Sequence, residues 1–288
     1  MPLELTDDQI ATFDRDGFLI VEGLLAPDEI ERLRERVAPL FRWEFETGLY
    51  PDETNWREGR DRPDVTRQLC NAWKADRTLA RTLLRADIGR ACARLMRWSG
   101  ARINQDNLLW KPSGGGKPLG FHQDSSYQTW ITPPEMVTCW MTLDDTTAAG
   151  GTIAYARGSH KWGLAPPIKQ FHAPDDYTAE LRAAAASAGQ ALELVPIVVK
   201  AGGCAFHHGR TWHGSGPNTT ANERRALVAH CMAAEARFDP RAVGYIYGRY
   251  RRWGTTEMDE AHFPILWRED GYRSPFIEAF LEKGWQFA

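Results

Sequence analysis

The stretch Gly120-Phe121-His122-Gln123-Asp124 lies among short runs of mixed apolar and polar residues in the middle of the chain. In an extended strand, residues two apart point to the same side, so His122 and Asp124 can face one point together. A third ligand would come from elsewhere, and His213 is the best candidate. Two histidines and one carboxylate on one side of a metal leave positions open, which suits non-haem Fe(II) that binds a co-substrate and dioxygen. A strand-end histidine that hydrogen-bonds a nearby turn aspartate is the other interpretation, and the tripeptide alone leaves both open.

The residues around this stretch predict a mainly β fold. Short, partly alternating runs follow one another from about residue 100, separated by breaks such as Pro112-Ser113-Gly114-Gly115-Gly116 and Gly202-Gly203. Several short strands with turn residues between them are typical of a sandwich or jelly roll. The expected strands are residues 102–111, 136–143, 151–156, 193–199, 203–208, 210–215 and 225–233.

The first hundred residues instead show helical patterns. Thr6 followed by Gln9 fits a capping box, and this first helix should end at Gly17, before a short strand. Pro27 opens a second helix, and residues 78–97 return to helical spacing, whereas residues 43–76 show no regular pattern. We expect one domain over residues 1–288, made of a mostly helical flank (1–100), a barrel core (101–233) with an Ala-rich insertion (160–190), and an aromatic-rich C-terminal segment (234–288).

Composition and charge exclude several classes of protein. The 288 residues contain 35 Lys plus Arg and 38 Asp plus Glu, a net charge of −3, which gives no global field for binding nucleic acid. No run approaches the roughly 20 apolar residues of a membrane span, and the N-terminus lacks the pattern of a signal peptide. The five cysteines are scattered without a Cys-x-x-Cys pair, which favours a reducing compartment over a zinc site. We therefore expect a soluble, cytoplasmic protein.

An arginine follows His213 at a useful distance. Arg224 lies eleven residues later, at the start of an expected strand. An arginine there can reach into a barrel and hold a carboxylate through two parallel hydrogen bonds. A dicarboxylic keto acid that chelates a metal at one end would need such a partner at the other end. A solvated arginine at the end of the strand, like the neighbouring Arg225, is the alternative.

The chain resembles the phytanoyl-CoA dioxygenase family of Fe(II)/2-oxoglutarate oxygenases. Order and spacing agree as well as residue type, and the resemblance spans residues 12 to about 232. Four segments carry it: Thr12-Phe13-Asp14-Arg15-Asp16-Gly17-Phe18-Leu19-Ile20-Val21; His122-Gln123-Asp124-Ser125-Ser126-Tyr127; Cys139-Trp140-Met141-Thr142-Leu143-Asp144-Asp145, running into Gly150-Gly151 and Arg157-Gly158-Ser159-His160; and His213-Gly214-Ser215-Gly216-Pro217-Asn218, leading to Arg224.

The resemblance implies a double-stranded β-helix (a cupin-like jelly roll) with Fe(II) bound at one mouth of the barrel by His122, Asp124 and His213. It implies that 2-oxoglutarate and O2 are co-substrates, and that a C–H bond of a small biosynthetic or lipid-derived molecule is hydroxylated with release of succinate and CO2. Related halogenating enzymes have Ala or Gly where Asp124 stands, so the aspartate favours hydroxylation. The residues implied to contact 2-oxoglutarate are Arg224, Ser215, Trp140 and Asn107, with Gln68 where the family often has a lysine.

The substrate is less well defined by the sequence. Tyr127 and Trp130 follow the metal motif and are expected at the pocket entrance. The basic-aromatic run at 245–253 is either a lid over an anionic substrate or a solvated face. Of His207 and His208, one is expected to face the core and the other solvent, neither as a ligand. A catalytically inactive binding module on the same fold is the alternative function, although no ligand residue is missing.

Overall fold

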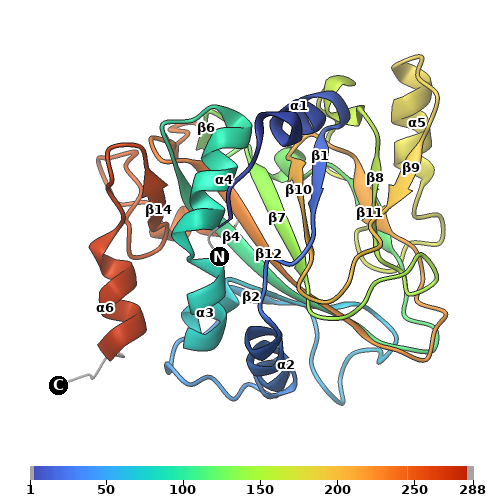
Figure 1. Ribbon diagram of the computed structural model, residues 1–288, viewed down its shortest axis with the longest axis horizontal. Coiled ribbons are helices and arrows are strands. Elements are labelled where there is room, and N and C mark those ends of the chain that lie inside the picture. The colour runs from blue at the N-terminus through green and yellow to red at the C-terminus, as the bar shows by residue number, and fades with distance from the viewer. Residues whose placement is uncertain (1–2, 245, 284–288) are drawn as a thin grey trace.

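The computed structural model describes residues 3–244 and 246–283. Two antiparallel sheets face each other, as the double-stranded β-helix requires (Figure 1). The large sheet has the order β1-β10-β7-β12-β4-β3-β2, with β14 also paired to β4, and the small sheet has the order β5-β11-β8-β9. A further two-stranded sheet joins β13 to β6.

The strands of the large sheet are β1 (Phe18–Val21), β2 (Glu53–Thr54), β3 (Arg67–Cys70), β4 (Gly100–Lys111), β7 (Val137–Thr142), β10 (Cys204–His208), β12 (Arg224–Ala233) and β14 (Ile265–Arg268). Those of the small sheet are β5 (Leu119–His122), β8 (Ile153–Ala156), β9 (Leu194–Pro196) and β11 (His213–Ser215), and the remaining pair is β6 (Ile131–Thr132) and β13 (Arg237–Phe238). The helices are α1 (Asp7–Asp16), α2 (Pro27–Phe41), α3 (Arg77–Leu83), α4 (Ala86–Met96), α5 (Ala179–Ser187) and α6 (Pro275–Lys283).

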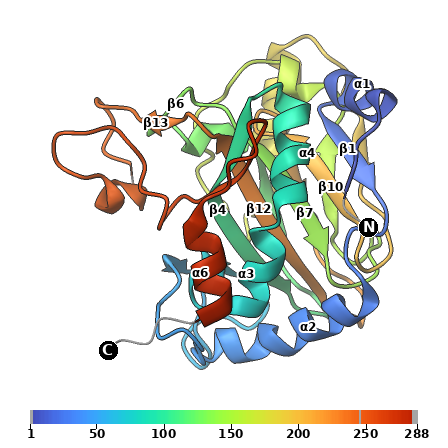
Figure 2. The same ribbon diagram turned by 60° about the vertical axis from the view of Figure 1, so that its left-hand side comes forward.

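Helices α3 and α4 cover the outer face of the large sheet, and α2 runs along its end (Figure 2). Strand alternation explains how one sheet serves two environments, because successive side chains point to opposite faces. On β12, Leu227 and Ala229 belong to the core under the helices, whereas Val228 belongs to the core between the sheets. On β7, Cys139 and Trp140 divide in the same way. The inner face of these strands therefore supplies the wall of the barrel.

The first helix and its flanking strand confirm the predictions made for them. Thr6 and Gln9 form the capping box, and Gly17 ends α1 in the left-handed conformation (φ 83°). The sequence Phe18–Val21 forms β1, which pairs with β10. A side chain at position 17 would collide with His160 and Thr211 as well as strain the backbone, so glycine is needed there for both reasons.

Three predicted boundaries are wrong. Residues 78–97 form two helices, α3 and α4, which break at Arg85; both bury their apolar faces in one core, so spacing alone does not show the break. Residues 43–76 are not wholly irregular, because β2 and β3 extend the large sheet there. Strand β5 was not predicted as a separate strand, although it carries His122.

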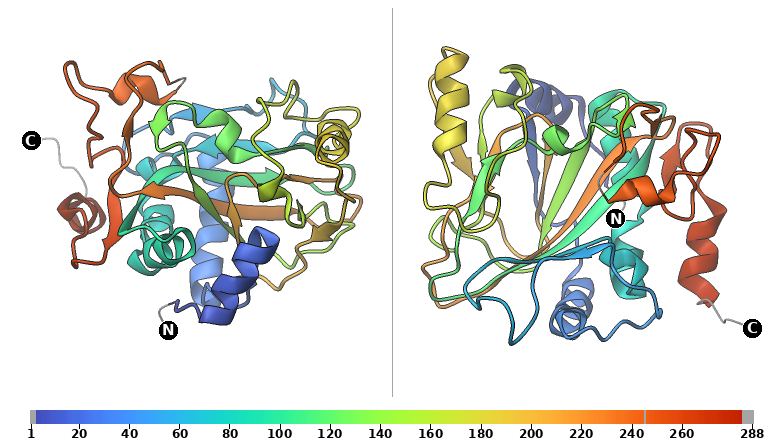
Figure 3. Two further views of the ribbon diagram at one scale, coloured as in Figure 1. Left: turned by 90° about the horizontal axis from the view of Figure 1, so that it is seen from above. Right: turned by 180° about the vertical axis from the view of Figure 1, so that it is seen from behind.

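The Ala-rich insertion contains α5, which stands at the opposite end of the molecule from α6 (Figure 3). No helix in residues 3–244 and 246–283 is long and apolar enough to cross a membrane.

Candidate active site

Three side chains from two neighbouring strands converge at one end of the small sheet. His122 ends β5, Asp124 begins the short helical turn after it, and His213 begins β11, where it is the register partner of His122. Their ligand atoms lie within 4.8 Å of one another. Asp124 Oδ1 is 3.3 Å from His122 Nε2 and 3.4 Å from His213 Nε2. The structure thus brings together the three residues that the sequence singled out.

Backbone carbonyls fix the tautomers of the two histidines. Nδ1 of His122 donates to Gly120 O at 2.9 Å, and Nδ1 of His213 donates to Thr211 O at 2.9 Å. A carbonyl only accepts, so each Nδ1 carries the proton when the ring is neutral and each Nε2 presents a lone pair. Three electron-pair donors therefore face one point, an arrangement that fits a cation such as Fe(II).

The charges of this group are consistent with metal binding. Burial, with His213 nearby, lowers the pKa of His122. Burial alone would raise the pKa of Asp124, yet His213 and the other surrounding histidines hold that pKa well below its usual range. A neutral imidazole and an ionised carboxylate are the forms that bind metals. These two groups are thus in ligand form at neutral pH. Burial alone would lower the pKa of His213, whereas the Asp124 carboxylate raises it.

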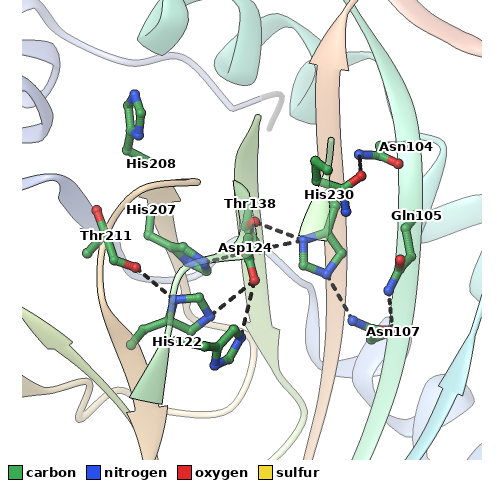
Figure 4. A network of polar contacts seen from close by, with 12 residues as sticks. Asn104, Gln105, Asn107, His122, Asp124, Thr138, His207, His208, Thr211 and His230 are labelled. Atoms are coloured by element: carbon green, nitrogen blue, oxygen red, sulfur yellow. Dashed lines mark hydrogen bonds and ion pairs between the residues drawn. The ribbon is translucent and has the colours of Figure 1, made fainter. Parts of the chain in front are cut away.

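The second oxygen of Asp124 is held by a chain of hydrogen bonds (Figure 4). Thr138 Oγ1 donates to Asp124 Oδ2 at 2.7 Å, and His230 Nδ1 lies 2.9 Å from the same hydroxyl. Since the hydroxyl proton goes to the carboxylate, His230 donates from Nδ1 and its Nε2 accepts from Asn107 Nδ2 at 2.9 Å. The chain Asn107–His230–Thr138–Asp124 leaves only Oδ1 directed at the two Nε2 atoms.

His207 completes this arrangement from the opposite side. Its Nε2 lies 3.0 Å from Asp124 Oδ2 and its Nδ1 lies 3.0 Å from Tyr155 Oη. Burial lowers the pKa of His207 to about 3, so the ring is neutral, donates to the carboxylate and accepts from the tyrosine. His208 stands apart from the group in Figure 4 and is half-buried, with its ring centre 5.6 Å from that of His160. Of the two histidines, His207 therefore faces the core as predicted, whereas His208 does not simply face solvent.

The sequence did not single out Thr138, His207 or His230, although a signal exists. Thr138 lies two residues before Trp140 and shares its inward face. Both histidines are register partners of Thr138, one on β10 and the other on β12. The signal becomes visible only once the pairing of three strands distant in sequence is known.

An inner cavity adjoins the three ligand residues, between the two sheets. Its lining includes every residue that the resemblance implied for 2-oxoglutarate: Gln68, Asn107, Trp140, Ser215 and Arg224. Gln68 Nε2 donates to Asn107 Oδ1 at 3.0 Å, so the two side-chain amides are joined where they line the cavity.

Arg224 is the basic residue of this cavity. It is 3% exposed, burial lowers its pKa to about 10, and its Nε has no hydrogen-bond partner among the described residues. Its guanidinium carbon lies 6.0 Å from the ring centre of Trp140. Arg225, by contrast, is half-buried and forms two hydrogen bonds with Asp144 at 2.7 and 3.0 Å. The two neighbouring arginines therefore differ, and only Arg224 is placed to receive an anion.

Lys111 is a buried basic residue that sequence reasoning missed. It is fully buried, it is the register partner of Arg224, and its Nζ lies 2.7 Å from Ser215 Oγ and 2.5 Å from Gly216 O. Burial, with Arg224 nearby, lowers the pKa of Lys111 well below its usual range. Neither basic group forms an ion pair within the part of the chain that the structure describes, and Arg224, which lines the cavity, is therefore the group that can receive an anion there.

A sequence profile of the family described as phytanoyl-CoA dioxygenase (PhyH) matches residues 13–226. The chain belongs to the phytanoyl-CoA dioxygenase family. Among curated proteins, it is 24% identical over 242 residues to the multifunctional dioxygenase prhA of Penicillium brasilianum, covering 80% of this chain and 73% of that protein. It is also 29% identical over 163 residues to the ectoine dioxygenase of Nocardia farcinica, covering 55% of this chain and 52% of that protein.

Solved structures of other proteins share the fold. The epimerase SnoN from nogalamycin biosynthesis, crystallised with Fe3+, alpha ketoglutarate and nogalamycin RO, aligns with a TM-score of 0.69 at 21% identity, covering 90% of this chain and 98% of that chain. AviO1 from Streptomyces viridochromogenes Tue57 aligns with a TM-score of 0.57 at 27% identity, covering 83% and 98%. The predicted double-stranded β-helix, the family and its use of iron, 2-oxoglutarate and O2 are confirmed. The protein is an Fe(II)/2-oxoglutarate-dependent dioxygenase.

A second, outer pocket of about 400 Å³ lies on the other side of His122 and Asp124. Tyr127 and Trp130, which the sequence placed at the entrance, both line it. From the basic-aromatic run at 245–253, Tyr247 also lines the pocket, whereas Arg251 and Arg252 line a separate surface recess. Arg249 donates to the backbone carbonyls of Ile246 and Asp52, and Tyr245 lies outside the described residues. The described arginines therefore do not form the anion clamp considered for this run.

Proposed function

We propose that this dioxygenase hydroxylates a C–H bond of a small molecule, and that His122, Asp124 and His213 hold its Fe(II). Bound Fe(II) supplies the oxidising chemistry, in which O2 gives one oxygen atom to the substrate and one to succinate as 2-oxoglutarate loses CO2. The observation that carries the proposal is the convergence of two Nε2 atoms on Asp124 Oδ1, next to a cavity that is lined by buried Arg224 and to an outer pocket.

In this proposal the inner cavity holds the far carboxylate of 2-oxoglutarate. Arg224 offers its guanidinium N–H groups, and a planar guanidinium matches a carboxylate in a two-bond contact. Lys111 donates to Ser215 Oγ, so the Ser215 hydroxyl proton is left to donate to the same carboxylate. Trp140 closes the wall beside these groups and keeps water out.

The hydrogen bonds to Asp124 Oδ2 position the carboxylate. With Thr138 and His207 on one oxygen, the other oxygen is fixed toward the two Nε2 atoms. Ligand groups that are held in place by such partners bind metal without first reorganising. Asn107 and Gln68, at the end of this series of hydrogen bonds away from Asp124, line both the inner cavity and the outer pocket.

The inactive binding module is not favoured. A barrel that only holds a ligand could lose a metal donor or the basic residue, and each of these is present and buried. The five cysteines are free, buried thiols, and we propose on this basis that the protein works in a reducing, cytoplasmic environment.

An anaerobic titration with Fe(II) and 2-oxoglutarate tests the proposed roles. We expect a weak visible charge-transfer band that saturates with both components in the parent protein. Asp124→Ala and His213→Ala should each abolish the band, because each removes one of three metal donors. Full band intensity and full succinate production in either variant would refute the ligand assignment. A metabolite screen coupled to succinate release then identifies the substrate.

A further inference from the structure

The outer pocket is lined largely by groups that form hydrogen bonds without carrying charge. Its lining includes four amide side chains, two tyrosines and a thiol. These residues are Gln68, Gln105, Asn107, Gln128, Tyr127 and Tyr247, with Cys70 at the edge. Such a surface suits a substrate that presents several hydroxyl groups.

Internal hydrogen bonds hold the amides in fixed orientations. Gln105 Nε2 donates to Asn107 Oδ1 at 2.9 Å, and Gln105 Oε1 accepts from Tyr247 Oη at 2.6 Å. Gln128 Oε1 accepts from Asn104 Nδ2 at 3.0 Å. Amides that are already oriented lose little conformational entropy when a ligand binds.

Some hydrogen-bonding capacity remains within this network. Gln128 Nε2 and Gln68 Oε1 have no partner among the residues that the structure describes, and both side chains line the pocket. One group donates and the other accepts, so together they match hydroxyl groups, which do both.

Aromatic rings supply the remaining walls. Phe171 lies against His122, with ring centres 4.6 Å apart, and Trp130 packs on Tyr247 at 4.9 Å. Rings beside oriented amides offer flat apolar faces next to directional polar groups. A saturated ring can contact both kinds of group, because its edge can carry hydroxyl groups that hydrogen-bond the amides while its apolar face packs on the aromatic rings.

The lining of the outer pocket includes a free carboxylate but no lysine or arginine among the described residues. No lysine or arginine lines it in the described part of the chain, whereas Glu53 does, and Glu53 forms no ion pair there. Glu53 Oε2 accepts only from the Cys70 thiol, at 3.7 Å. The nearby Lys74 is already paired with Asp52 at 2.7 Å. A phosphate or carboxylate on the substrate that lay near Glu53 would meet a like charge, with no lysine or arginine among the described lining residues to pair with it.

We propose that the substrate is a hydroxyl-bearing ring compound, neutral or cationic, with a protonated amine placed against Glu53. The inference rests on the proposed oxidation at the adjoining centre and specifies what that centre oxidises. It excludes acyl-CoA thioesters and other phosphate-bearing molecules. Glu53 is exposed at the pocket edge, so it selects by charge, while the amides and rings select by shape.

Three probes with one ring and different charge test this assignment. D-Glucosamine, D-glucose and D-glucuronate are titrated calorimetrically, in mildly acidic buffer and without oxygen, into protein loaded with Fe(II) and 2-oxoglutarate. We expect glucosamine to bind about threefold more tightly than glucose, as is usual for one partly exposed ion pair, and glucuronate to bind more weakly than both.

Glu53→Gln should abolish the preference for glucosamine over glucose. Glu35→Gln is the matched control, because Glu35 is exposed on α2 and does not line the pocket; it should keep the preference. The inference is overturned if glucuronate binds as well as glucosamine, if none of the three probes binds, or if Glu53→Gln keeps the preference. The Fe(II)–2-oxoglutarate band is recorded on the same samples, so a normal band with no charge preference refutes the inference alone, and a missing band refutes the proposed function.

Discussion

Thr138→Val removes the hydroxyl that holds Asp124 and leaves the shape of the side chain almost unchanged. Thr138 is fully buried, and its Oγ1 donates to Asp124 Oδ2 at 2.7 Å while lying 2.9 Å from His230 Nδ1. Valine is β-branched like threonine, so no cavity opens in the strand. The change therefore tests the hydrogen bond itself.

The expected loss follows from the charge on the acceptor. A hydrogen bond to a charged group is worth about 1.5–3 kcal/mol, which corresponds to a factor of about 10–100 in a binding constant. Replacing an outer partner of a metal ligand usually lowers metal affinity by about the same factor. Since His207 still holds Asp124 Oδ2 at 3.0 Å, we expect Fe(II) affinity to fall by about tenfold.

The matched control is Thr142→Val on the same strand. Thr142 is equally buried, but its Oγ1 donates to the backbone carbonyl of Asp144 at 2.7 Å and not to the metal site. Both variants should lose about 1–3 kcal/mol of unfolding free energy, because each loses a hydroxyl that both donates and accepts a hydrogen bond. Only Thr138→Val should weaken Fe(II) binding in the anaerobic titration. Equal Fe(II) affinity in the two folded variants would refute the positioning role of Thr138.

Three further predictions concern the inner cavity and pH. Arg224→Lys should weaken 2-oxoglutarate binding by about 30-fold or more and leave Fe(II) binding nearly unchanged. Arg225→Lys should leave both binding constants nearly unchanged. Equal 2-oxoglutarate dissociation constants in the two variants would reassign the carboxylate contact. Lys111→Met should weaken 2-oxoglutarate binding, because Ser215 loses its donor, and should lower the melting temperature, because the hydrogen bonds from Lys111 Nζ to Ser215 Oγ and Gly216 O are lost; unchanged 2-oxoglutarate binding in the folded variant would contradict this role. The pKa of buried His207 is about 3, below its value of about 6.5 in the unfolded chain, so between these two pH values only the unfolded state binds the extra proton. The metal-free protein should therefore lose stability as pH falls below about 6.5. A melting temperature that stays constant from neutral pH to about pH 5 would contradict this prediction.

Two of the proposed metal donors could be grouped from sequence because their relation is local. His122 and Asp124 are two residues apart at a strand end, and that spacing alone sets both side chains on one side. His213 could be named only as a candidate from elsewhere in the chain, and the register His213–His122 shows that its strand lies beside the first.

The partners of these donors could not be predicted, because their positions depend on long-range strand pairing. Thr138 on β7 is the register partner of His207 on the neighbouring strand β10 and of His230 on the other neighbour, β12. The three residues come from separate parts of the chain. A one-residue shift in either pairing would turn the histidine to the opposite face. Lys111 was missed for a different reason, since lysine is almost never fully buried and composition gives no cause to expect it inside.

The two ends of the inner cavity differ in how far the protein completes them by itself. At the metal end, the chain from Asn107 through His230 and Thr138 to Asp124 gives each group a donor or an acceptor in a consistent direction. At the other end, Arg224 and Lys111 lie side by side without an acidic partner among the described residues. Buried polar groups cost little when they are paired and a great deal when they are not. The metal end is therefore organised before ligands arrive, whereas the far end reaches its full hydrogen bonding only with a bound carboxylate. This difference is why Thr138→Val is expected to act on iron and Arg224→Lys on 2-oxoglutarate, although both side chains belong to one cavity wall.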